Sequence, residues 1–161
     1  MPFLPRNRIE RARNGSIAVG LPRAERELLA ALPRELLGQL ETQPDDPALQ
    51  RLFPPAYDDG DSEREYQELM ADELLAGRRR ALETLEQTAG AKRLDDDQAQ
   101  AWLTALNDLR LVLGTRLDVT EDLSLATLSP EHPRSREYAL YAYLSWLQEQ
   151  LIQALAAALR A

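Results

Sequence analysis

The sequence has no cysteine and only one histidine, His132. The absence of cysteine excludes disulfides, thiolate nucleophiles, cysteine-ligated zinc and thiol redox switches. A single imidazole also excludes zinc sites built from several histidines and catalytic histidine pairs. No arrangement of serine, histidine and acid indicates hydrolytic catalysis, and no cofactor is expected. An enzymatic function is therefore disfavoured.

Long apolar runs are also missing from the 161 residues, although 44% of them are hydrophobic. No segment offers the roughly 20 apolar residues that a membrane-spanning helix needs, so no membrane contact is expected. The arginine-rich start lacks the apolar segment of a secretory signal, which favours a cytoplasmic location. The length suits one domain with its own core, and we predict a single domain over residues 1–161.

Charge is distributed unevenly along the chain, whose formal net charge is −8. Residues 1–34 contain seven arginines and three glutamates, which leaves twelve basic and twenty-four acidic residues for the rest. Such a basic segment is a candidate for DNA binding, whereas the acidic remainder repels phosphate. The alternative is that these arginines are merely solvated. The candidate DNA contacts are Arg6, Arg8, Arg11 and Arg13.

The predicted fold is mainly α, a bundle of about four to five helices with a small N-terminal β-hairpin. Asn14-Gly15, a pair favoured in tight primed turns, predicts the hairpin within residues 1–20. Residues 21–41 are expected to form short helices, because Pro33 interrupts the apolar pattern. Residues 42–61 contain four prolines and five aspartates, which predicts a long connecting loop.

Apolar side chains within this proline- and aspartate-rich loop predict that it is anchored to the core. Leu52 precedes the Phe53-Pro54-Pro55 run, and Tyr57 follows it. An exposed docking peptide for a partner is the functional alternative. The residues of that candidate docking loop are Arg51, Phe53, Pro54, Pro55 and Tyr57.

Residues 62–161 are expected to form long helices, over about 62–89, over about 94–117 and from about residue 134 to the C-terminus. The aspartates at 95–97 suit the positive end of a helix dipole. The last helix carries Tyr138, Tyr141 and Trp146 outside its leucine stripe, so one neighbour cannot cover its apolar surface. It either lies centrally in the bundle or forms a homodimer through its second face.

Two arginines fall inside apolar helix faces, Arg78 between Leu74 and Leu82 and Arg110 near Leu103. A buried guanidinium costs several kilocalories per mole unless it is paired, so each should meet a carboxylate, several carbonyls or an anion.

Two interpretations of these arginines stay open. Internal pairing would tie Arg110 to the turn that follows its helix or to the proline-rich loop. Alternatively, a polar notch would bind a phosphate or a partner's carboxylate through forked hydrogen bonds. The candidate notch comprises Arg78, Asn107, Arg110 and Gly114.

Two segments, RLFPPAY at 51–57 and WLTALNDLRLVLGTRLDVTE at 102–121, resemble the hallmark segments of an actinobacterial family of unknown function. One branch of that family is described as an oxidative-stress regulator of actinomycetes. The resemblance implies a small cytoplasmic regulator that acts through protein partners. The redox mode attributed to that branch relies on a cysteine pair, which this sequence lacks. The residues carried over from the hallmark segments are Arg51, Phe53, Pro54, Pro55, Asn107, Asp108, Arg110, Gly114 and Arg116.

The sequence thus favours a non-enzymatic regulatory or adaptor protein that binds a protein partner, without a cysteine switch, and a transcription complex is one setting in which it could act. Direct DNA binding through the N-terminal segment is one alternative, and it predicts an affinity that falls steeply with added salt. A small anion- or metal-dependent enzyme is another, and it predicts thermal stabilisation by phosphate, nucleotide or magnesium. No particular residue is identified as a metal ligand.

Overall fold

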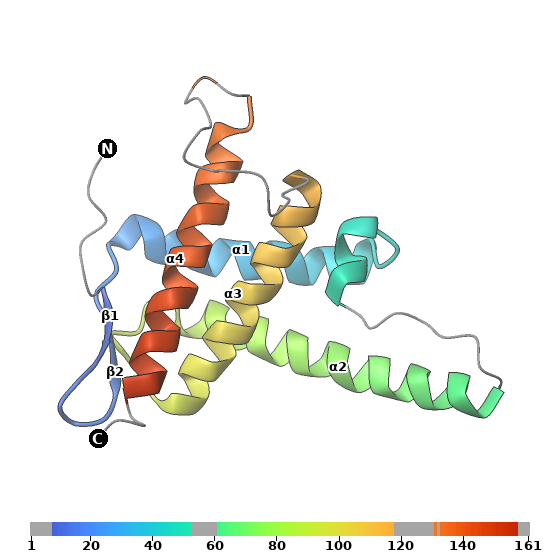
Figure 1. Ribbon diagram of the computed structural model, residues 1–161, viewed down its shortest axis with the longest axis horizontal. Helices are drawn as coiled ribbons and strands as arrows, with labels where there is room; N and C mark the ends of the chain where they lie inside the picture. Colours follow the sequence, from blue (N-terminus) through green and yellow to red (C-terminus); the bar gives the residue numbers. More distant parts are fainter. Residues whose placement is uncertain (1–7, 53–60, 118–130, 132, 158–161) are drawn as a thin grey trace.

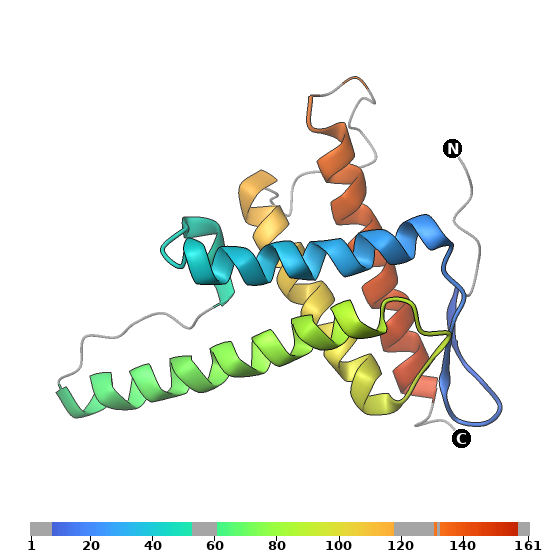
Figure 2. The same cartoon turned by 180° about the vertical axis from the view of Figure 1, so that it is seen from behind.

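The computed structural model describes residues 8–52, 61–117, 131 and 133–157. Within these ranges, four α-helices and one 3-10 helix enclose an apolar core beside a small antiparallel sheet (Figure 1). This arrangement confirms the predicted mainly α bundle with an N-terminal hairpin. The bundle is irregular, because its helices cross one another at several angles and one of them extends well beyond the rest (Figures 1 and 2).

The hairpin pairs β1 (Ile9–Arg11) with β2 (Ile17–Val19). Its turn differs from the predicted primed turn. The amide of Gly15 donates to the carbonyl of Ala12 over 3.0 Å, and Gly15 has a φ of 87°. A three-residue loop that ends in a left-handed glycine therefore replaces the two-residue turn. This geometry suits the right-handed strand twist equally well.

A third strand, β3 (Arg93–Leu94), pairs antiparallel with β2 and places Leu94 opposite Ile17. The sequence did not predict this strand, because two residues are too few to show an alternating pattern. The sheet therefore joins the N-terminal hairpin to the connection between two long helices.

The prediction of short helices over 21–41 is wrong, because α1 (Arg23–Thr42) is one continuous helix that contains Pro33. Proline inside a helix removes one backbone hydrogen bond at a cost of about 3 kcal/mol. Here the Pro33 ring is buried on the same face as Leu29, Leu36 and Leu40. Burial of this face on the core offsets the missing bond.

The predicted loop over 42–61 contains regular structure, the 3-10 helix η1 (Pro47–Leu52). Asp46 initiates it, since its Oδ1 accepts a hydrogen bond from the Ala48 amide over 2.9 Å. Leu49 and Leu52 are fully buried against the bundle. Residues 53–60 lie outside the described residues.

Helix α2 (Asp61–Thr88) has the predicted extent but only part of the predicted packing. Ala81, Leu82 and Leu85 are buried, whereas Leu74, which was expected in the same apolar face, is 37% exposed. At the usual rise the 28 residues span about 42 Å. The first half of α2 projects past the other helices, as both ribbon views show (Figures 1 and 2).

Helix α3 (Asp96–Leu117) lies at the centre of the molecule and contacts α1, α2, α4 and η1. A reciprocal cap begins it: the Gln98 amide donates to Asp95 Oδ1 over 2.7 Å, and the Asp95 amide donates to Gln98 Oε1 over 3.0 Å. Such a box satisfies two amides that a helix end leaves free. The acidic start predicted for this helix therefore acts through a specific side-chain cap.

The last helix, α4 (Ser135–Ala157), packs on α3 with one side and on β1 with another, so the central position belongs to α3 instead. Two of its aromatic side chains have internal partners. The Tyr138 hydroxyl donates to the Leu117 carbonyl over 3.1 Å, and the Trp146 ring lies 6.0 Å from that of Tyr143. Among its described residues, Ile152 is the one large hydrophobic side chain classed as exposed. A homodimer through α4 stays a prediction with little apolar surface to support it.

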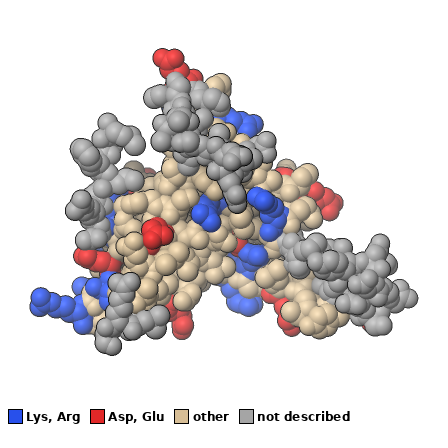
Figure 3. Space-filling view, in the orientation of Figure 1, with Lys and Arg blue, Asp and Glu red and all other residues tan. Residues whose placement is uncertain are grey.

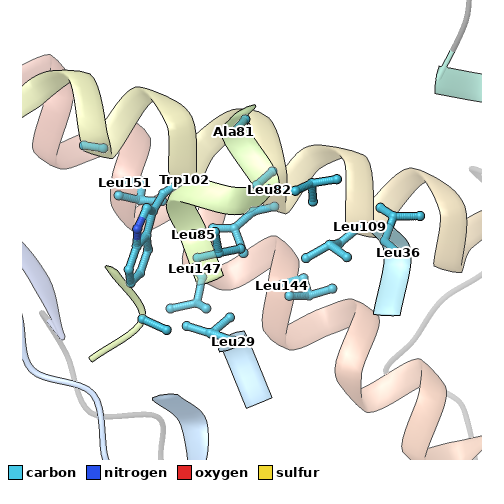
Figure 4. Packing of buried hydrophobic residues seen from close by; sticks show 14 of the residues in the cluster. Leu29, Leu36, Ala81, Leu82, Leu85, Trp102, Leu109, Leu144, Leu147 and Leu151 are labelled. Atoms are coloured by element: carbon cyan, nitrogen blue, oxygen red, sulfur yellow. The ribbon is translucent and has the colours of Figure 1, made fainter. Parts of the chain in front are cut away.

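The core lies where α1, α2, α3 and α4 meet, and Figure 4 shows leucines from all four helices converging there. Trp102 of α3 is the largest fully buried side chain. Its indole Nε1 donates to Thr88 Oγ1 over 2.6 Å, which links α3 to the last turn of α2. The packed halves of α2 and α3 are therefore fixed relative to each other by both apolar and polar contacts.

Arg26, in the first turns of α1, joins the sheet to the helices through backbone carbonyls alone. Its guanidinium donates to Leu21 over 2.8 Å and to Val19 over 2.7 Å. It also donates to Ala89 over 3.1 Å and to Ala91 over 2.7 Å. The four carbonyls belong to the β2–α1 connection and to the segment between α2 and β3.

We expect Arg26→Met to lower the free energy of unfolding by about 3 kcal/mol, the upper end of the range for one hydrogen bond to a charged group, because the contributions of four bonds made by one side chain do not add. Arg26→Lys should recover only part of this loss, because one ammonium cannot reach all four carbonyls. Urea unfolding followed by circular dichroism measures both. A loss below about 1 kcal/mol for Arg26→Met would contradict the structural role.

Candidate functional site

Arg78 of α2 points at α3 and forms an ion pair with Asp108. The Asp108 side chain is 0% exposed and that of Arg78 is 18% exposed, so the pair lies largely inside the contact between the two helices. The sequence singled out Arg78 but did not identify Asp108 as its partner. The signal in the sequence was the spacing of this residue. Asp108 lies three residues after Ala105 and four before Val112, two apolar residues that the structure buries.

Burial raises the pKa of Asp108 above the usual range of an aspartate, and the neighbouring Arg78 opposes that shift. Asp108 Oδ2 and Arg78 Nε are buried and have no hydrogen-bond partner among the described residues. The pair is therefore incompletely satisfied. It acts as a buried electrostatic contact between α2 and α3.

Arg110 lies on the side of α3 that faces α4 and is half-buried. Its Nη2 donates to Asn107 Oδ1 over 3.3 Å, and the same oxygen accepts from Gln148 Nε2 of α4 over 3.4 Å. Its Nε is buried without a partner, and within the described part of the chain Arg110 meets no carboxylate. The guanidinium therefore has one long hydrogen bond among the described residues, which is less than the internal-pairing interpretation expects.

The candidate notch is thus divided between two helix contacts. Arg78 pairs with Asp108 between α2 and α3, whereas Asn107 and Arg110 lie toward Gln148 between α3 and α4. The structure does not bring the two arginines together on one ligand. The anion-notch interpretation stays a prediction that concerns Arg110 and its neighbours.

Gly114 of α3 lies against the side chain of Tyr141 of α4. A Cβ atom at this position would lie 3.0 Å from Cε2 of Tyr141. The group that approaches this glycine is an aromatic ring of α4. Gly114 therefore has a packing function, since it leaves space for the Tyr141 ring.

Arg116, the last of the carried-over residues in α3, connects three elements near the end of that helix. Its Nη2 donates to Gln39 Oε1 of α1 over 2.7 Å and approaches Asp46 Oδ2 at 3.4 Å. Its carbonyl accepts from Arg134 Nη1 over 2.8 Å. Arg116 also lines a cleft of about 530 Å³ between α1, α3 and α4, whose floor includes Leu36.

Of the candidate docking loop, the structure describes only Arg51, which is exposed at the end of η1. Phe53, Pro54, Pro55 and Tyr57 lie outside the described residues. The docking-peptide alternative for this loop therefore stays a prediction.

Two of the four candidate DNA contacts have internal partners. Arg8 pairs with Glu25 of α1 and lies over the Trp146 ring, 5.8 Å from its centroid. Arg11 donates to Asp96 Oδ1 over 2.6 Å and to the Ala154 carbonyl over 3.2 Å. These contacts hold the hairpin on α1, α3 and α4. Arg13 is exposed in the hairpin loop, and Arg6 lies outside the described residues.

A substitution test of DNA binding therefore needs Arg13, because alanine at Arg8 or Arg11 would also break structural contacts.

The Tyr143 phenol lies near Arg8. Burial raises the pKa of this phenol, and the Glu25 carboxylate acts in the same direction. Tyr143 consequently stays neutral at physiological pH.

No cluster of three metal-ligating side chains occurs among the described residues. In the same ranges, no helix has the length and apolar character required to cross a bilayer.

An exposed apolar surface, which the sequence analysis did not predict, lies on the projecting half of α2. Four large side chains are exposed there at spacings of three and four residues, so they share one side of the helix. They are Tyr66 (63%), Leu69 (58%), Met70 (42%) and Leu74 (37%). The sequence shows their spacing, but not that the helix extends past the body that would cover them.

Comparison with known proteins gives a family and a set of curated relatives. The profile of a family described as Domain of unknown function (DUF2017) matches residues 6–155. The AosR protein of Mycobacterium leprae (strain TN) is 32% identical over 133 residues, or 71% of this chain and 61% of the relative. Oxidative stress regulator AosR of Mycobacterium tuberculosis (strain ATCC 25618 / H37Rv) is 31% identical over 128 residues, or 68% and 58%.

These matches confirm the family resemblance that the two hallmark segments indicate. The chain spans about three fifths of the length of the curated relatives it matches. No solved structure shows a significant match to it.

Proposed function

Because this chain belongs to the DUF2017 family, whose curated relatives include proteins named oxidative stress regulator, we propose that it is a non-enzymatic regulator that acts by binding a protein partner. The proposal transfers the regulatory role and not a redox mechanism. The chain contains no cysteine, so no thiol switch operates within it.

The observation that carries the proposal is the exposed apolar side of α2, formed by Tyr66, Leu69, Met70 and Leu74. Contiguous apolar surface of this kind is uncommon on monomeric proteins and marks interaction sites. Tyrosine and methionine are also among the residues enriched at protein interfaces. A projecting helix presents this surface to a partner without any rearrangement of the core.

Affinity capture from a native lysate of the source organism tests the function. The expected result is at least one protein retained by this chain but not by an unrelated protein of equal charge, and the purified pair should form a complex of defined stoichiometry. Recovery of no specific protein, or failure of the purified pair to associate, would reject the proposal.

A thermal-shift panel tests the enzymatic alternative separately. Phosphate, nucleotides and magnesium are expected to leave the melting temperature unchanged, because a ligand stabilises only a state that binds it. A dose-dependent rise with any of them would favour the alternative.

A further inference from the structure

The projecting half of α2 that carries the apolar surface is acidic: Glu65 and Asp72 lie beside the surface and Glu73 lies within it. Glu65, Glu68, Asp72 and Glu73 are all exposed, and none forms an ion pair among the described residues. The sequence has no lysine or arginine between residues 65 and 77. Figure 3 shows uncharged and acidic side chains at the lower right of that view, on the part of α2 that the grey atoms leave visible. The surface therefore combines an apolar row with a local negative charge.

We propose that this part of α2, residues 65–77, binds a cationic amphipathic helix of a partner protein; this inference rests on the proposed function. An apolar row at helical spacing accepts the i, i+3, i+4 stripe of a second helix. Lysines or arginines beside that stripe would face Glu65 and Asp72, which lie next to Leu69 around the helix. Thirteen residues at the usual rise make a contact of about 20 Å, which matches a partner helix of three to four turns.

Charge distinguishes this occupant from the others. A second copy of the chain would place Glu65, Asp72 and Glu73 against the same residues, because a symmetric dimer brings identical surfaces together. Like charges at an interface are unfavourable. Nucleic acids and anionic membranes are repelled for the same reason. A cationic helix satisfies both the apolar row and the carboxylates.

The inference is tested with the full chain and defined peptides, followed by fluorescence anisotropy. The probe is a labelled leucine–lysine peptide with helical amphipathic spacing. Its controls are a scrambled peptide of the same composition and a leucine–glutamate peptide of the same spacing. Wild type is expected to bind the probe at least tenfold more tightly than either control, with an affinity that falls as salt rises.

Variants localise the binding to α2. Leu69→Ser with Met70→Ser should weaken binding of the probe at least tenfold. Glu65→Gln with Asp72→Asn should weaken it severalfold and reduce its dependence on salt. Ile152→Ser, which alters an exposed apolar residue of α4, is the matched control and should change nothing. All these side chains are exposed, so circular dichroism should show unchanged folding.

Equal binding of the scrambled peptide, unchanged binding by both α2 variants, or an equal effect of Ile152→Ser would overturn the inference. A wild-type dimer in sedimentation that Leu69→Ser with Met70→Ser abolishes would identify a second copy as the occupant and also overturn it. Lysate capture that succeeds with wild type and survives both α2 variants would leave the proposed function intact and reject this surface alone.

Discussion

Replacing Arg78 with methionine should lower the free energy of unfolding by about 3–5 kcal/mol at pH 8, the range seen when one member of a buried ion pair is removed. The reason is the partner rather than the arginine. Asp108 is 0% exposed and would remain in the α2–α3 contact without a compensating charge. Methionine retains much of the side-chain volume, so little of the loss comes from a cavity.

The loss of stability caused by Arg78→Met should be smaller at lower pH. Burial raises the pKa of Asp108, and Arg78→Met removes the neighbouring charge that opposes this shift. A carboxyl whose pKa is higher in the folded state binds its proton more tightly there, so its contribution is fully present below the unfolded pKa and is lost as pH rises through the folded pKa. The deficit of Arg78→Met relative to wild type is therefore expected to be smaller at pH 5 than at pH 8.

Urea unfolding of both proteins at the two pH values measures this difference. Arg110→Met is the matched control, because Arg110 lies in an equally apolar stretch of α3 but loses only one 3.3 Å hydrogen bond. It should change stability by no more than about 1 kcal/mol, since its buried Nε already lacks a partner. Equal losses for the two variants, or a deficit independent of pH, would contradict the buried-pair assignment.

The two arginines show how far sequence reasoning reaches. The apolar spacing around Arg78 and Arg110 predicted that both side chains lie against helix contacts, because helical periodicity is a local property. Their partners depend on the register and rotation of α2, α3 and α4 relative to one another, which the periodicity of a single helix does not determine. Asp108 was therefore visible as an acid in an apolar stretch, but not as the partner of Arg78.

Arg26 was missed for a related reason. Its four acceptors are backbone carbonyls from two segments, and no residue type encodes a carbonyl that faces a guanidinium. At Pro33 the sequence predicted a feature, a helix break, that the structure does not contain. The local penalty of proline predicted a helix break, and burial of its ring with Leu29 and Leu36 overrode that penalty. Both cases concern tertiary contacts that act over local preferences.

The exposed row on α2 also depends on tertiary packing. The spacing of Leu74 with Leu82 predicted one continuous apolar face, yet the neighbours of α2 end before Leu74 is covered. Where packing ends along a long helix is a property of the whole bundle. The sequence predicted the helix and its amphipathic side, and only the structure separates the buried half from the half available to a partner.

Trp102→Ala should lower the free energy of unfolding by about 4 kcal/mol, since truncation of a fully buried aromatic residue removes transfer energy and leaves a cavity. Figure 4 shows the indole beside Leu85 and Leu151, at the junction of α2, α3 and α4. Trp102→Phe should lower the free energy of unfolding by only about 1–2 kcal/mol, because most of the side-chain volume remains. This smaller loss includes the broken hydrogen bond to Thr88. Thermal and urea unfolding measure both variants.

A substitution on the exposed side of α2 is the counterpart of Trp102→Ala in the core. Leu69→Ser should change stability by less than about 0.5 kcal/mol, because its side chain is already 58% exposed. Similar losses for Leu69→Ser and Trp102→Ala would mean that the row is covered in solution, by a second copy or by another part of the chain. Since α2 is held by its packed half alone, Trp102→Ala should also weaken partner binding in proportion to the unfolded fraction, whereas Leu69→Ser should weaken it with the fold intact.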